Sequence, residues 1–185
     1  MNPMMRPNKR PVPWGEIKLL ILDCDGVLTN GKIIYGSDGQ DIKQFNAADG
    51  MGLILIREIS TRVAVVSGRS SEALQRRCQD LKIEHLYQGI DNKLECVTKL
   101  LEELGLTFDN VIYMGDDWND VPCIRRAALG VVPANAWPEV QKTADMVTER
   151  RGGEGAVREL INLILHKKGV YDSAIRNYLE SVGCK

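Results

Sequence analysis

Two aspartate motifs, far apart in the chain, contain the residues best suited to chemistry. The first is Asp23-Cys-Asp25-Gly, and the second is Gly-Asp116-Asp117-Trp-Asn-Asp120. Asp23 and Asp25 stand two residues apart, so an extended backbone points both side chains the same way. Carboxylates gathered in one pocket disfavour joint ionisation, and a hard divalent cation removes that penalty. Oxygen ligands without a set of histidines and cysteines predict Mg²⁺ rather than zinc as the cofactor.

Ser67 and Lys93 follow two other expected strands and extend this chemistry. An aspartate can act as a covalent nucleophile that forms an aspartyl-phosphate, and a second aspartate can then protonate the leaving alcohol. Phosphoryl transfer also needs charge to be neutralised on the transferring oxygens, and a lysine ammonium with a serine hydroxyl supplies part of that. The residue types therefore predict phosphoryl transfer.

Short apolar runs alternate with amphipathic stretches from Ile17 onward, and they are the elements that must position these groups. Strands are expected over 17–22, 62–66, 85–87, 111–114, 129–132 and 146–148, and helices over 50–59, 71–81, 92–104, 118–127, 138–143, 154–167 and 175–182. This alternation predicts an α/β fold with a doubly wound parallel sheet and helices on both faces. Segments 32–35 and 41–45 flank a glycine-rich loop, which predicts a β-hairpin inserted after the first strand. In such sheets the site lies at the carboxyl ends of the strands.

Four motifs in order resemble the haloacid dehalogenase superfamily of phosphatases over about residues 17 to 167. They are Asp23-x-Asp25-Gly-Val-Leu-Thr29, Ser67-Gly, Lys93 and Gly-Asp116-Asp117-x-Asn-Asp120. The resemblance implies that Asp23 is the nucleophile and Asp25 the general acid and base. It also implies that Ser67 and Lys93 hold the phosphoryl group.

The same resemblance implies a magnesium site and its surroundings. Asp116 would bind Mg²⁺ together with Asp23 and the backbone carbonyl of Asp25. Thr29 would be a nearby positioning residue. Asp117 and Asp120 would lie behind the ligands or orient Lys93.

Further segments are similar to the family of 3-deoxy-D-manno-octulosonate 8-phosphate phosphatases, a capless branch of that superfamily. They are Phe45-Asn46-x-x-Asp49-Gly50-x-Gly52, Ser67-Gly-Arg69-Ser-Ser71, Tyr87-Gln-Gly89 and the run 151–159. The resemblance implies hydrolysis of that keto-sugar acid phosphate to the free sugar acid and phosphate through an aspartyl-phosphate, in lipopolysaccharide precursor synthesis. It also implies a homotetramer whose hairpins cluster at the centre.

Five residues are expected at the substrate besides Asp25 and Lys93, and each also has a structural interpretation. Arg69 offers a planar fork that matches a carboxylate, although both Arg69 and Arg77 could be surface charges. Asn46, Asp49 and Gly50 begin an expected helix, which the first two residues could simply cap. Trp118 is expected to pack, and Cys24 to face the core.

Three other functions stay open from the sequence. The first is a phosphatase of a nine-carbon keto-sugar acid 9-phosphate of the sialic-acid type, although Arg69 favours the eight-carbon branch. The second is a non-catalytic assembly domain of a sialate-activating enzyme, which would be expected to lose part of the motif set. The third is a receiver domain, which also gathers aspartates, a hydroxyl and a lysine but carries its acidic motifs in another order.

Composition sets the remaining bounds. The 185 residues have a net charge of −1 and a pI near 6.2, so no positive field predicts binding to nucleic acid or anionic lipid. Five cysteines, an odd number with no C-x-x-C pair, predict neither a zinc ribbon nor a disulfide framework. No apolar run reaches the ~18 residues of a membrane span, and no signal core follows the basic start, so a cytoplasmic protein is expected.

The chain is expected to comprise three parts. Residues 1–15 are expected to be disordered, 16–168 to form the phosphatase domain, and 169–185 to form a helical tail. The hairpin within 27–45 holds Ile33, Ile34 and Tyr35, too few apolar residues for a core of its own. An exposed strand edge invites pairing with another chain. We therefore expect a homotetramer in which the hairpin or tail of one subunit walls the site of the next.

Overall fold

The computed structural model describes residues 4–5, 11–37, 39, 41–59 and 61–184. Its strands are β1 (Met4–Met5), β2 (Leu19–Leu22), β3 (Ile34–Tyr35), β4 (Asp41–Ile42), β5 (Arg62–Val66), β6 (His85–Tyr87), β7 (Val111–Met114), β8 (Leu129–Val132) and β9 (Met146–Val147). Its α-helices are α1 (Ala47–Ile56), α2 (Glu72–Asp80), α3 (Lys93–Leu104), α4 (Val121–Ile124), α5 (Pro138–Gln141), α6 (Ala156–Lys167) and α7 (Tyr171–Ser181). Two short 3-10 helices cover Trp14–Glu16 and Phe108–Asn110.

The described residues form one large sheet with the strand order β1-β9-β8-β7-β2-β5-β6. Every pairing from β9 to β6 is parallel, and β1 adds to β9 in the antiparallel sense. The chain builds β5 and β6 on one side of β2 and then returns to place β7 on the other side. The expected doubly wound sheet is therefore confirmed, and the order of its strands switches between β2 and β7.

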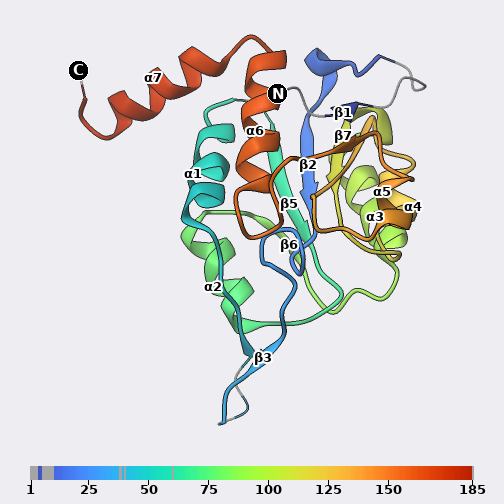
Figure 1. Cartoon of the computed structure of the whole chain (residues 1–185). Helices are drawn as coiled ribbons and strands as arrows, with labels where there is room; N and C mark the ends of the chain where they lie inside the picture. The colour runs from blue at the N-terminus through green and yellow to red at the C-terminus, as the bar shows by residue number, and fades with distance from the viewer. Residues whose placement is uncertain (1–3, 6–10, 38, 40, 60, 185) are drawn as a thin grey trace.

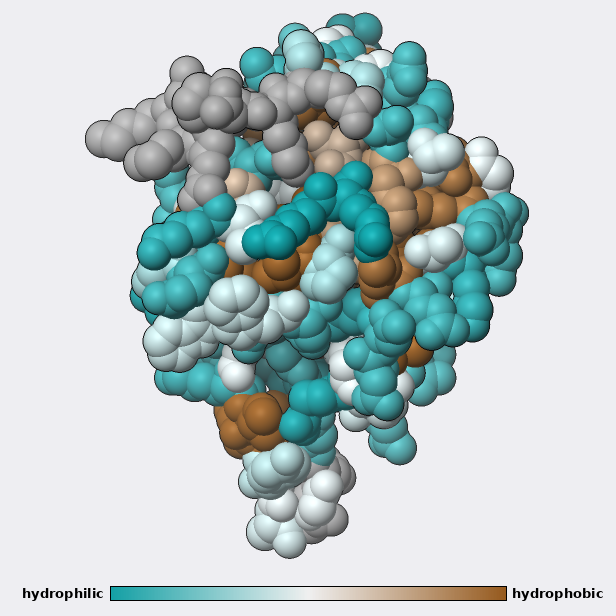
Figure 2. Space-filling view, turned by 90° about the vertical axis from the view of Figure 1, so that its right-hand side faces the viewer, coloured by the Kyte–Doolittle hydropathy of each residue, from teal (hydrophilic) through white to brown (hydrophobic). Residues whose placement is uncertain are grey.

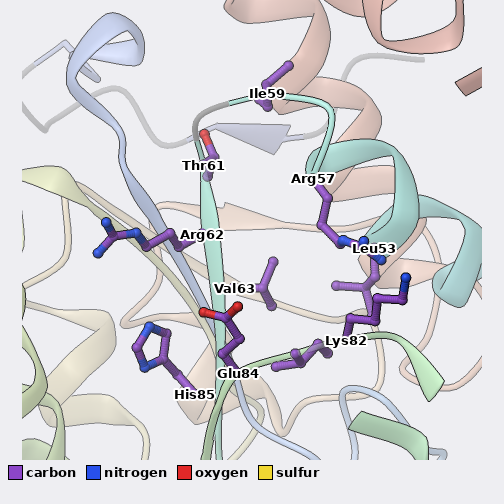
Figure 3. Close-up of a pocket in the computed structure, with 10 residues that line it drawn as sticks. Leu53, Arg57, Ile59, Thr61, Arg62, Val63, Lys82, Glu84 and His85 are labelled. Carbon is purple, nitrogen blue, oxygen red and sulfur yellow. The ribbon is translucent and has the colours of Figure 1, made fainter. Parts of the chain in front are cut away.

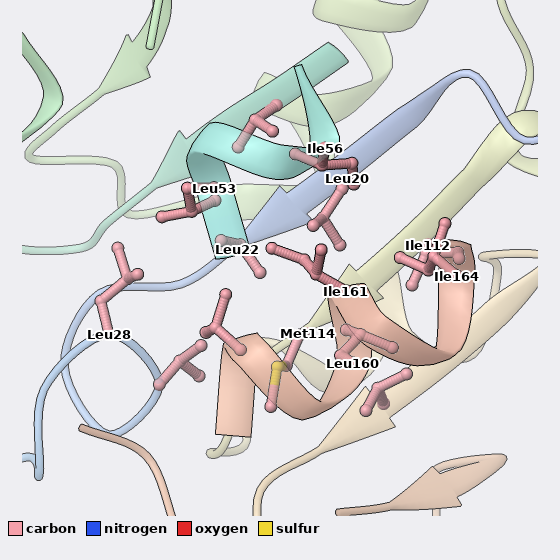
Figure 4. Close-up of a cluster of buried hydrophobic side chains, with 14 of the residues drawn as sticks. Leu20, Leu22, Leu28, Leu53, Ile56, Ile112, Met114, Leu160, Ile161 and Ile164 are labelled. Carbon is pink, nitrogen blue, oxygen red and sulfur yellow. The ribbon is translucent and has the colours of Figure 1, made fainter. Parts of the chain in front are cut away.

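Strand β2 has buried side chains on both faces of the sheet. All four of its residues are buried, as expected for a parallel strand between two helical layers. Leu20 and Leu22 belong to a cluster with apolar residues of α1 and α6, and Figure 4 shows these side chains packed together. Leu19 and Ile21 point to the opposite face, where a second cluster includes residues of α3 and α4. Figure 1 shows α1, α2 and α6 on one side of the sheet and α3, α4 and α5 on the other.

The expected hairpin is present as β3 and β4, which pair antiparallel with Tyr35 opposite Asp41. It lies outside the large sheet and projects from the body at the edge where the strands of the sheet end (Figure 1). Ile33, Ile34, Tyr35 and Ile42 are between 44% and 68% exposed. The space-filling view shows the same projection with an apolar area near its base (Figure 2).

Both ends of the chain add to the sheet domain. Met4–Met5 forms β1 within the segment expected to be disordered, because β9 otherwise leaves its strand edge open, and residues 1–3 and 6–10 lie outside the described part. The expected C-terminal helix begins earlier than Ile175, at Tyr171, whose ring stacks on His166 with centroids 4.0 Å apart. In the described part of the chain, no helix is both long and apolar enough to cross a membrane.

Several helices are shorter than expected, most of all the one at 118–127. The helix expected over 118–127 is reduced to α4, because the Asp120 carboxylate binds the backbone N–H groups of Asp116 and Asp117 and turns the chain before the helix begins. The helix expected over 138–143 ends at Gln141.

Candidate active site

Parallel strands that end side by side bring the two aspartate motifs together. Leu22 at the end of β2 pairs with β5 on one side and with Met114 of β7 on the other. The Asp23 backbone N–H continues this pairing by donating to the Met114 carbonyl at 2.9 Å. Asp23, Ser67 and Asp116 therefore emerge at one edge of the sheet, at the switch point between β2 and β7, and line the same cavity.

Lys93, the first residue of α3, is buried between two carboxylates. Its Nζ atom lies 2.9 Å from Asp23 Oδ1 and 2.8 Å from Asp120 Oδ1. Asn92 caps the helix by accepting a hydrogen bond from the Glu95 N–H, which fixes the point where Lys93 leaves the backbone. An ammonium buried between two carboxylates is held as a fixed positive charge at the floor of the cavity.

Asp120 is fully buried and organises the second motif. Its Oδ1 accepts hydrogen bonds from Lys93 and from the Tyr113 hydroxyl, the latter at 2.7 Å. Its Oδ2 accepts from the backbone N–H groups of Asp116 at 3.1 Å and Asp117 at 3.4 Å. Because both Asp120 oxygens are occupied, this residue shapes the loop and orients Lys93, while Asp116 lines the cavity.

The buried carboxylates carry more negative charge than Lys93 balances. Burial and the nearby Asp120 raise the pKa of Asp23 to about 7, against the lowering effect of Lys93. Burial and the neighbouring carboxylates, first Asp23, raise the pKa of Asp116 to about 8. Burial lowers the pKa of Lys93, but Asp120 and Asp23 outweigh it, so the net shift is upward. A cation is the group that relieves this excess of negative charge.

The donor set fits a hard divalent cation. Carboxylate oxygens of Asp23, Asp116 and Asp120 lie within 4.8 Å of one another. Since four donors already occupy the two oxygens of Asp120, Asp23 and Asp116 are the carboxylates of this group with oxygens left to bind a cation. Carboxylate oxygens in a cavity open to a phosphate suit Mg²⁺, which keeps part of its shell for water and phosphate.

Gly26 allows the two motifs to approach each other. Its φ is +90°, and a β-carbon built on it would lie 1.9 Å from Asp116 Oδ2, so a side chain is excluded on both grounds. The Thr29 hydroxyl supports this turn by accepting from the backbone N–H groups of Gly26 at 3.4 Å and Gly31 at 3.2 Å. Sequence reasoning missed Asn135, whose Nδ2 donates to the Gly26 carbonyl at 3.0 Å, because no motif marks it.

Asp25 is held by two cations, one of which sequence reasoning also missed. Lys43, whose side chain is 3% exposed, donates from Nζ to Asp25 Oδ1 and lies 3.8 Å from Asp41 Oδ2. Arg69 Nε lies 3.7 Å from Asp25 Oδ2, and its guanidinium stands 5.9 Å from the centre of the Tyr35 ring. Lys43 lies within the segment 41–45 of the expected hairpin, but no sequence spacing relates it to Asp25, so this contact could not be predicted.

These side chains surround a cavity of about 510 Å³. Ser67 contributes from the end of β5, where its hydroxyl accepts from the Arg69 N–H at 3.3 Å. The residues that line the cavity are Asp23, Asp25, Gly31, Ser67, Gly68, Arg69, Lys93, Asp116, Asp117, Trp118 and Asn119. Cys24 is fully buried in the core, as expected from its place between the two aspartates.

Four residues expected at the substrate lie outside this lining. Asn46 caps α1, and the Asp49 carboxylate accepts from two backbone N–H groups at the start of α6, including that of Arg158 at 2.8 Å. Arg77 Nη2 donates to the Asn46 carbonyl at 3.3 Å, and a β-carbon on Gly50 would lie 2.2 Å from the same nitrogen. These contacts hold α1 against α2 and α6, and contact with a substrate stays a prediction for all four residues.

Trp118 does not pack in the interior as expected. Its side chain is 60% exposed and lines the cavity. The reason is the turn that Asp120 imposes on residues 116–120, which places Trp118 before the helix rather than on its buried face.

Known proteins are similar to most of this chain. A family model described as haloacid dehalogenase-like hydrolase matches residues 83–160, which include Lys93 and the second aspartate motif. The chain is 44% identical over 159 residues to an Escherichia coli (strain K12) protein named 3-deoxy-D-manno-octulosonate 8-phosphate phosphatase KdsC. That match covers 86% of this chain and 85% of the E. coli protein.

Solved structures are similar over most of the chain. One is the crystal structure of 3-deoxy-D-manno-octulosonate 8-phosphate phosphatase from Moraxella catarrhalis in complex with magnesium ion, phosphate ion and a KDO molecule. It has a TM-score of 0.86 and 36% identity, and covers 89% of this chain and 95% of that one. Another is the cobalt-bound form of the deoxy-D-mannose-octulosonate 8-phosphate phosphatase from Haemophilus influenzae. It has a TM-score of 0.82 and 35% identity, and covers 85% of this chain and 92% of that one.

Proposed function

We infer the function from one premise: the chain belongs to the family of 3-deoxy-D-manno-octulosonate 8-phosphate phosphatases, within the haloacid dehalogenase-like hydrolases. It is a phosphoric monoester hydrolase that converts this eight-carbon keto-sugar acid phosphate and water to the free sugar acid and inorganic phosphate, toward lipopolysaccharide precursors. Mg²⁺ is its cofactor. The observation that carries this function is the cavity in which Asp23, Lys93 and Asp116 meet, in a chain 44% identical to the E. coli phosphatase.

In the first step that we propose, Asp23 is the nucleophile. Its free carboxylate oxygen attacks phosphorus, a bond forms between that oxygen and phosphorus, and the bond from phosphorus to the sugar oxygen breaks. Lys93 and Ser67 line the same cavity and hold the phosphoryl oxygens. Lys93 also binds the other Asp23 oxygen, at 2.9 Å, and so fixes the direction of the attack.

Asp25 is the proposed general acid and base. It gives a proton to the leaving sugar oxygen, and later takes a proton from the water that attacks the aspartyl-phosphate, which releases inorganic phosphate and restores Asp23. Lys43 positions the Asp25 carboxylate by a hydrogen bond to Oδ1, and the positive charge of Arg69 lies 3.7 Å from Oδ2.

The cation would be held by the carboxylates of Asp23 and Asp116 and by the backbone carbonyl of Asp25. When bound, it supplies positive charge that stabilises the phosphoryl oxygens. Asp120, Asp117 and Thr29 would surround these ligands without binding the cation themselves. The first orients Lys93, and Thr29 holds the turn at Gly26.

Arg69 is the substrate contact that we propose at the rim of the cavity. Its side chain is 36% exposed, and a guanidinium can pair with the carboxylate of a sugar acid through two parallel hydrogen bonds. We assign no phosphate contact to Asn46, Asp49, Gly50 or Arg77.

We also propose a homotetramer. The support is the projecting hairpin, whose apolar residues Ile33, Ile34, Tyr35 and Ile42 are exposed and whose two short strands would be marginal alone. Burying four hairpins at a symmetric centre covers these side chains, and lets one subunit wall the site of the next. Sedimentation should therefore give four subunits for the wild type and fewer for Ile34→Asp, whereas a fully active monomeric wild type would contradict the proposal.

The proposed location is the cytoplasm, where the sugar acid phosphate would be made. Within the chain, residues 16–168 are proposed as the catalytic domain and 169–185 as a helical extension, since α7 packs through Ala174 on the sheet domain.

A substrate panel tests the function. Phosphate release is measured from 3-deoxy-D-manno-octulosonate 8-phosphate and from a nine-carbon keto-sugar acid 9-phosphate, first with Mg²⁺ and then with EDTA. The eight-carbon substrate should be hydrolysed with the higher kcat/KM, and EDTA should abolish both activities. Faster hydrolysis of the nine-carbon substrate would favour the alternative, and full turnover by metal-free protein would contradict the magnesium site.

A further inference from the structure

The indole of Trp118 forms part of the wall of the cavity. The side chain is 60% exposed. Trp118 belongs to neither hydrophobic cluster of the described residues, whereas Trp14 packs against the first of them. Its apolar surface is therefore presented to the cavity rather than to the core.

The loop beneath the indole is rigidly built. The Trp118 N–H donates to Asp117 Oδ1 at 2.7 Å, and the Trp118 carbonyl accepts from the Val121 N–H at 3.3 Å. Asp120, which is fully buried, holds the preceding turn through the N–H of Asp116. Hydrogen bonds of the backbone thus fix where Trp118 lies, and its side chain is not needed to hold the loop.

Trp118 differs in chemistry from the other residues that line the cavity. Among the described residues that line the cavity, the remainder are acidic, basic, small polar or glycine, so Trp118 supplies the one large apolar wall. The charged groups gather at Asp23 and Lys93, where the phosphoryl group would sit. Ligand pockets commonly combine a few polar groups that fix orientation with an apolar or aromatic surface that takes the rest of the ligand.

We propose that Trp118 determines specificity for a cyclic sugar phosphate by packing its indole against the apolar C–H face of the sugar ring. This inference rests on the proposed function, because it takes the sugar acid phosphate as the substrate. A pyranose ring has hydroxyls at its edge and C–H groups on its face, so a flat indole matches the face while Arg69 matches the carboxylate.

The experiment compares Trp118→Ala and Trp118→Phe with Trp137→Ala. Trp137 is a matched control, because its side chain is 66% exposed and lies outside the lining of the cavity. Steady-state kinetics are measured with 3-deoxy-D-manno-octulosonate 8-phosphate and with acetyl phosphate, whose two-carbon group has no ring. Trp118→Ala should lower the kcat/KM for the sugar acid phosphate, relative to that for acetyl phosphate, about 5- to 10-fold. The loss should come mainly from a higher KM for the sugar acid phosphate. Trp118→Phe should lower the kcat/KM ratio less, and Trp137→Ala should keep the wild-type ratio.

Binding gives a second readout that needs no turnover. Tryptophan emission is followed while the free sugar acid is added with Mg²⁺ and inorganic phosphate. The emission should change in the wild type and in Trp137→Ala, and the change should disappear in Trp118→Phe.

The outcomes separate a failure of the role of Trp118 from a failure of the proposed function. An unchanged kcat/KM ratio in Trp118→Ala, or the same change in Trp137→Ala, would overturn the role of Trp118 and leave the proposed function intact. A Trp118→Ala protein that changes its oligomeric state on sedimentation would also overturn it, because the indole would then belong to a subunit contact. A wild type that hydrolyses acetyl phosphate but not the sugar acid phosphate would instead contradict the proposed function.

Discussion

The two edges of the same sheet each carry a cavity lined by charged residues, and they differ in how those charges are held. The cavity at the carboxyl edge measures about 510 Å³, and the one at the amino edge about 380 Å³. At the carboxyl edge, Lys93 and Asp120 are buried and bind each other at 2.8 Å. At the amino edge, Arg62, Lys82 and Glu84 are exposed, and Figure 3 shows Arg62 directed away from Arg57.

Convergence and burial of charged groups, rather than cavity volume or charge alone, mark a site for chemistry. Arg57 at the amino edge donates to the Leu81 carbonyl at 3.3 Å, which is a common way to satisfy the last carbonyls of a helix. At the carboxyl edge, carboxylates are forced together out of water, a costly arrangement unless a cation or a reaction uses it.

The largest expected effect comes from Asp23→Asn. The amide is no nucleophile, so turnover of the sugar acid phosphate should fall by ~10⁴-fold or more. Phosphate release under saturating substrate measures this, with Arg62→Ala at the amino edge as the control for handling and folding. An Asp23→Asn protein with a tenth of the wild-type rate would contradict the role of Asp23 as the nucleophile.

Asp25→Asn is expected to be the next most damaging change. It should lower kcat by roughly 10²–10⁴-fold, the usual contribution of a general acid or base, while Mg²⁺ binding by calorimetry stays near that of the wild type. Lys43→Ala should lower kcat less than this, and Lys43→Arg should restore part of the loss, because an arginine can still hold the carboxylate. If Asp25→Asn turns over like the wild type, the acid and base assignment is wrong.

Arg69→Ala tests the rim of the cavity, where Arg69 lies, separately from the floor, where Lys93 lies. Loss of a hydrogen-bonded ion pair to the substrate should raise the KM for the sugar acid phosphate about 10- to 100-fold. The effect on acetyl phosphate, which has no carboxylate, should be several-fold smaller. Equal losses on both substrates would point to a structural role through Asp25.

The metal-free protein should lose stability as the pH rises. Folding raises the pKa of Asp23 to about 7 and that of Asp116 to about 8 from the ordinary 3.8, so the folded chain binds more protons than the unfolded chain between these values. The stability from these two groups is fully present below about pH 4 and is lost as the pH rises through 7 and 8. Thermal unfolding in EDTA should thus give a lower Tm at pH 8 than at pH 6, and added Mg²⁺ should restore the Tm at pH 8.

Asp116→Asn provides the control for this pH dependence. The variant lacks one of the two titrating carboxyls, so its Tm in EDTA should change less between pH 6 and pH 8. A wild-type Tm that rises over the same range would contradict the charge balance described for this edge.

The smallest effect is expected at the amino edge. Arg62→Ala and Lys82→Ala remove exposed charges, and such changes usually alter stability by about 0.5 kcal/mol or less. Both variants should keep wild-type kcat and KM. A tenfold loss of activity in either one would show that the two edges are coupled, which the comparison does not predict.

The sequence predicted the carboxyl edge well because its residues directly follow strands. Strands 62–66, 85–87, 111–114 and 129–132 were expected at their observed bounds, since short β-branched and apolar runs bounded by polar residues are typical of buried parallel strands. Parallel strands then bring whatever follows them to one edge, so the meeting of Asp23 with Asp116 needed no knowledge of the loops.

The contacts that depend on loops could not be predicted in this way. Lys43 reaches Asp25 from an inserted hairpin, and Asn135 reaches Gly26 across 109 residues, so no local spacing connects either pair. Trp118 was expected to pack, but its direction is decided by the hydrogen bonds of Asp120. Arg77 lies over Gly50 of α1, a contact that no motif predicts, and its contact with the substrate stays a prediction.

Detection of the phosphoryl group on Asp23 tests the proposed covalent step most directly. The wild type is mixed with the sugar acid phosphate and Mg²⁺, quenched in acid within milliseconds, digested and analysed by mass spectrometry. We expect a phosphorylated peptide whose modification lies at Asp23 and disappears as substrate is exhausted, and no such peptide from Asp23→Asn. Full turnover with no phosphate on the protein at any time, or with phosphate on another residue, would contradict the role of Asp23 as the nucleophile.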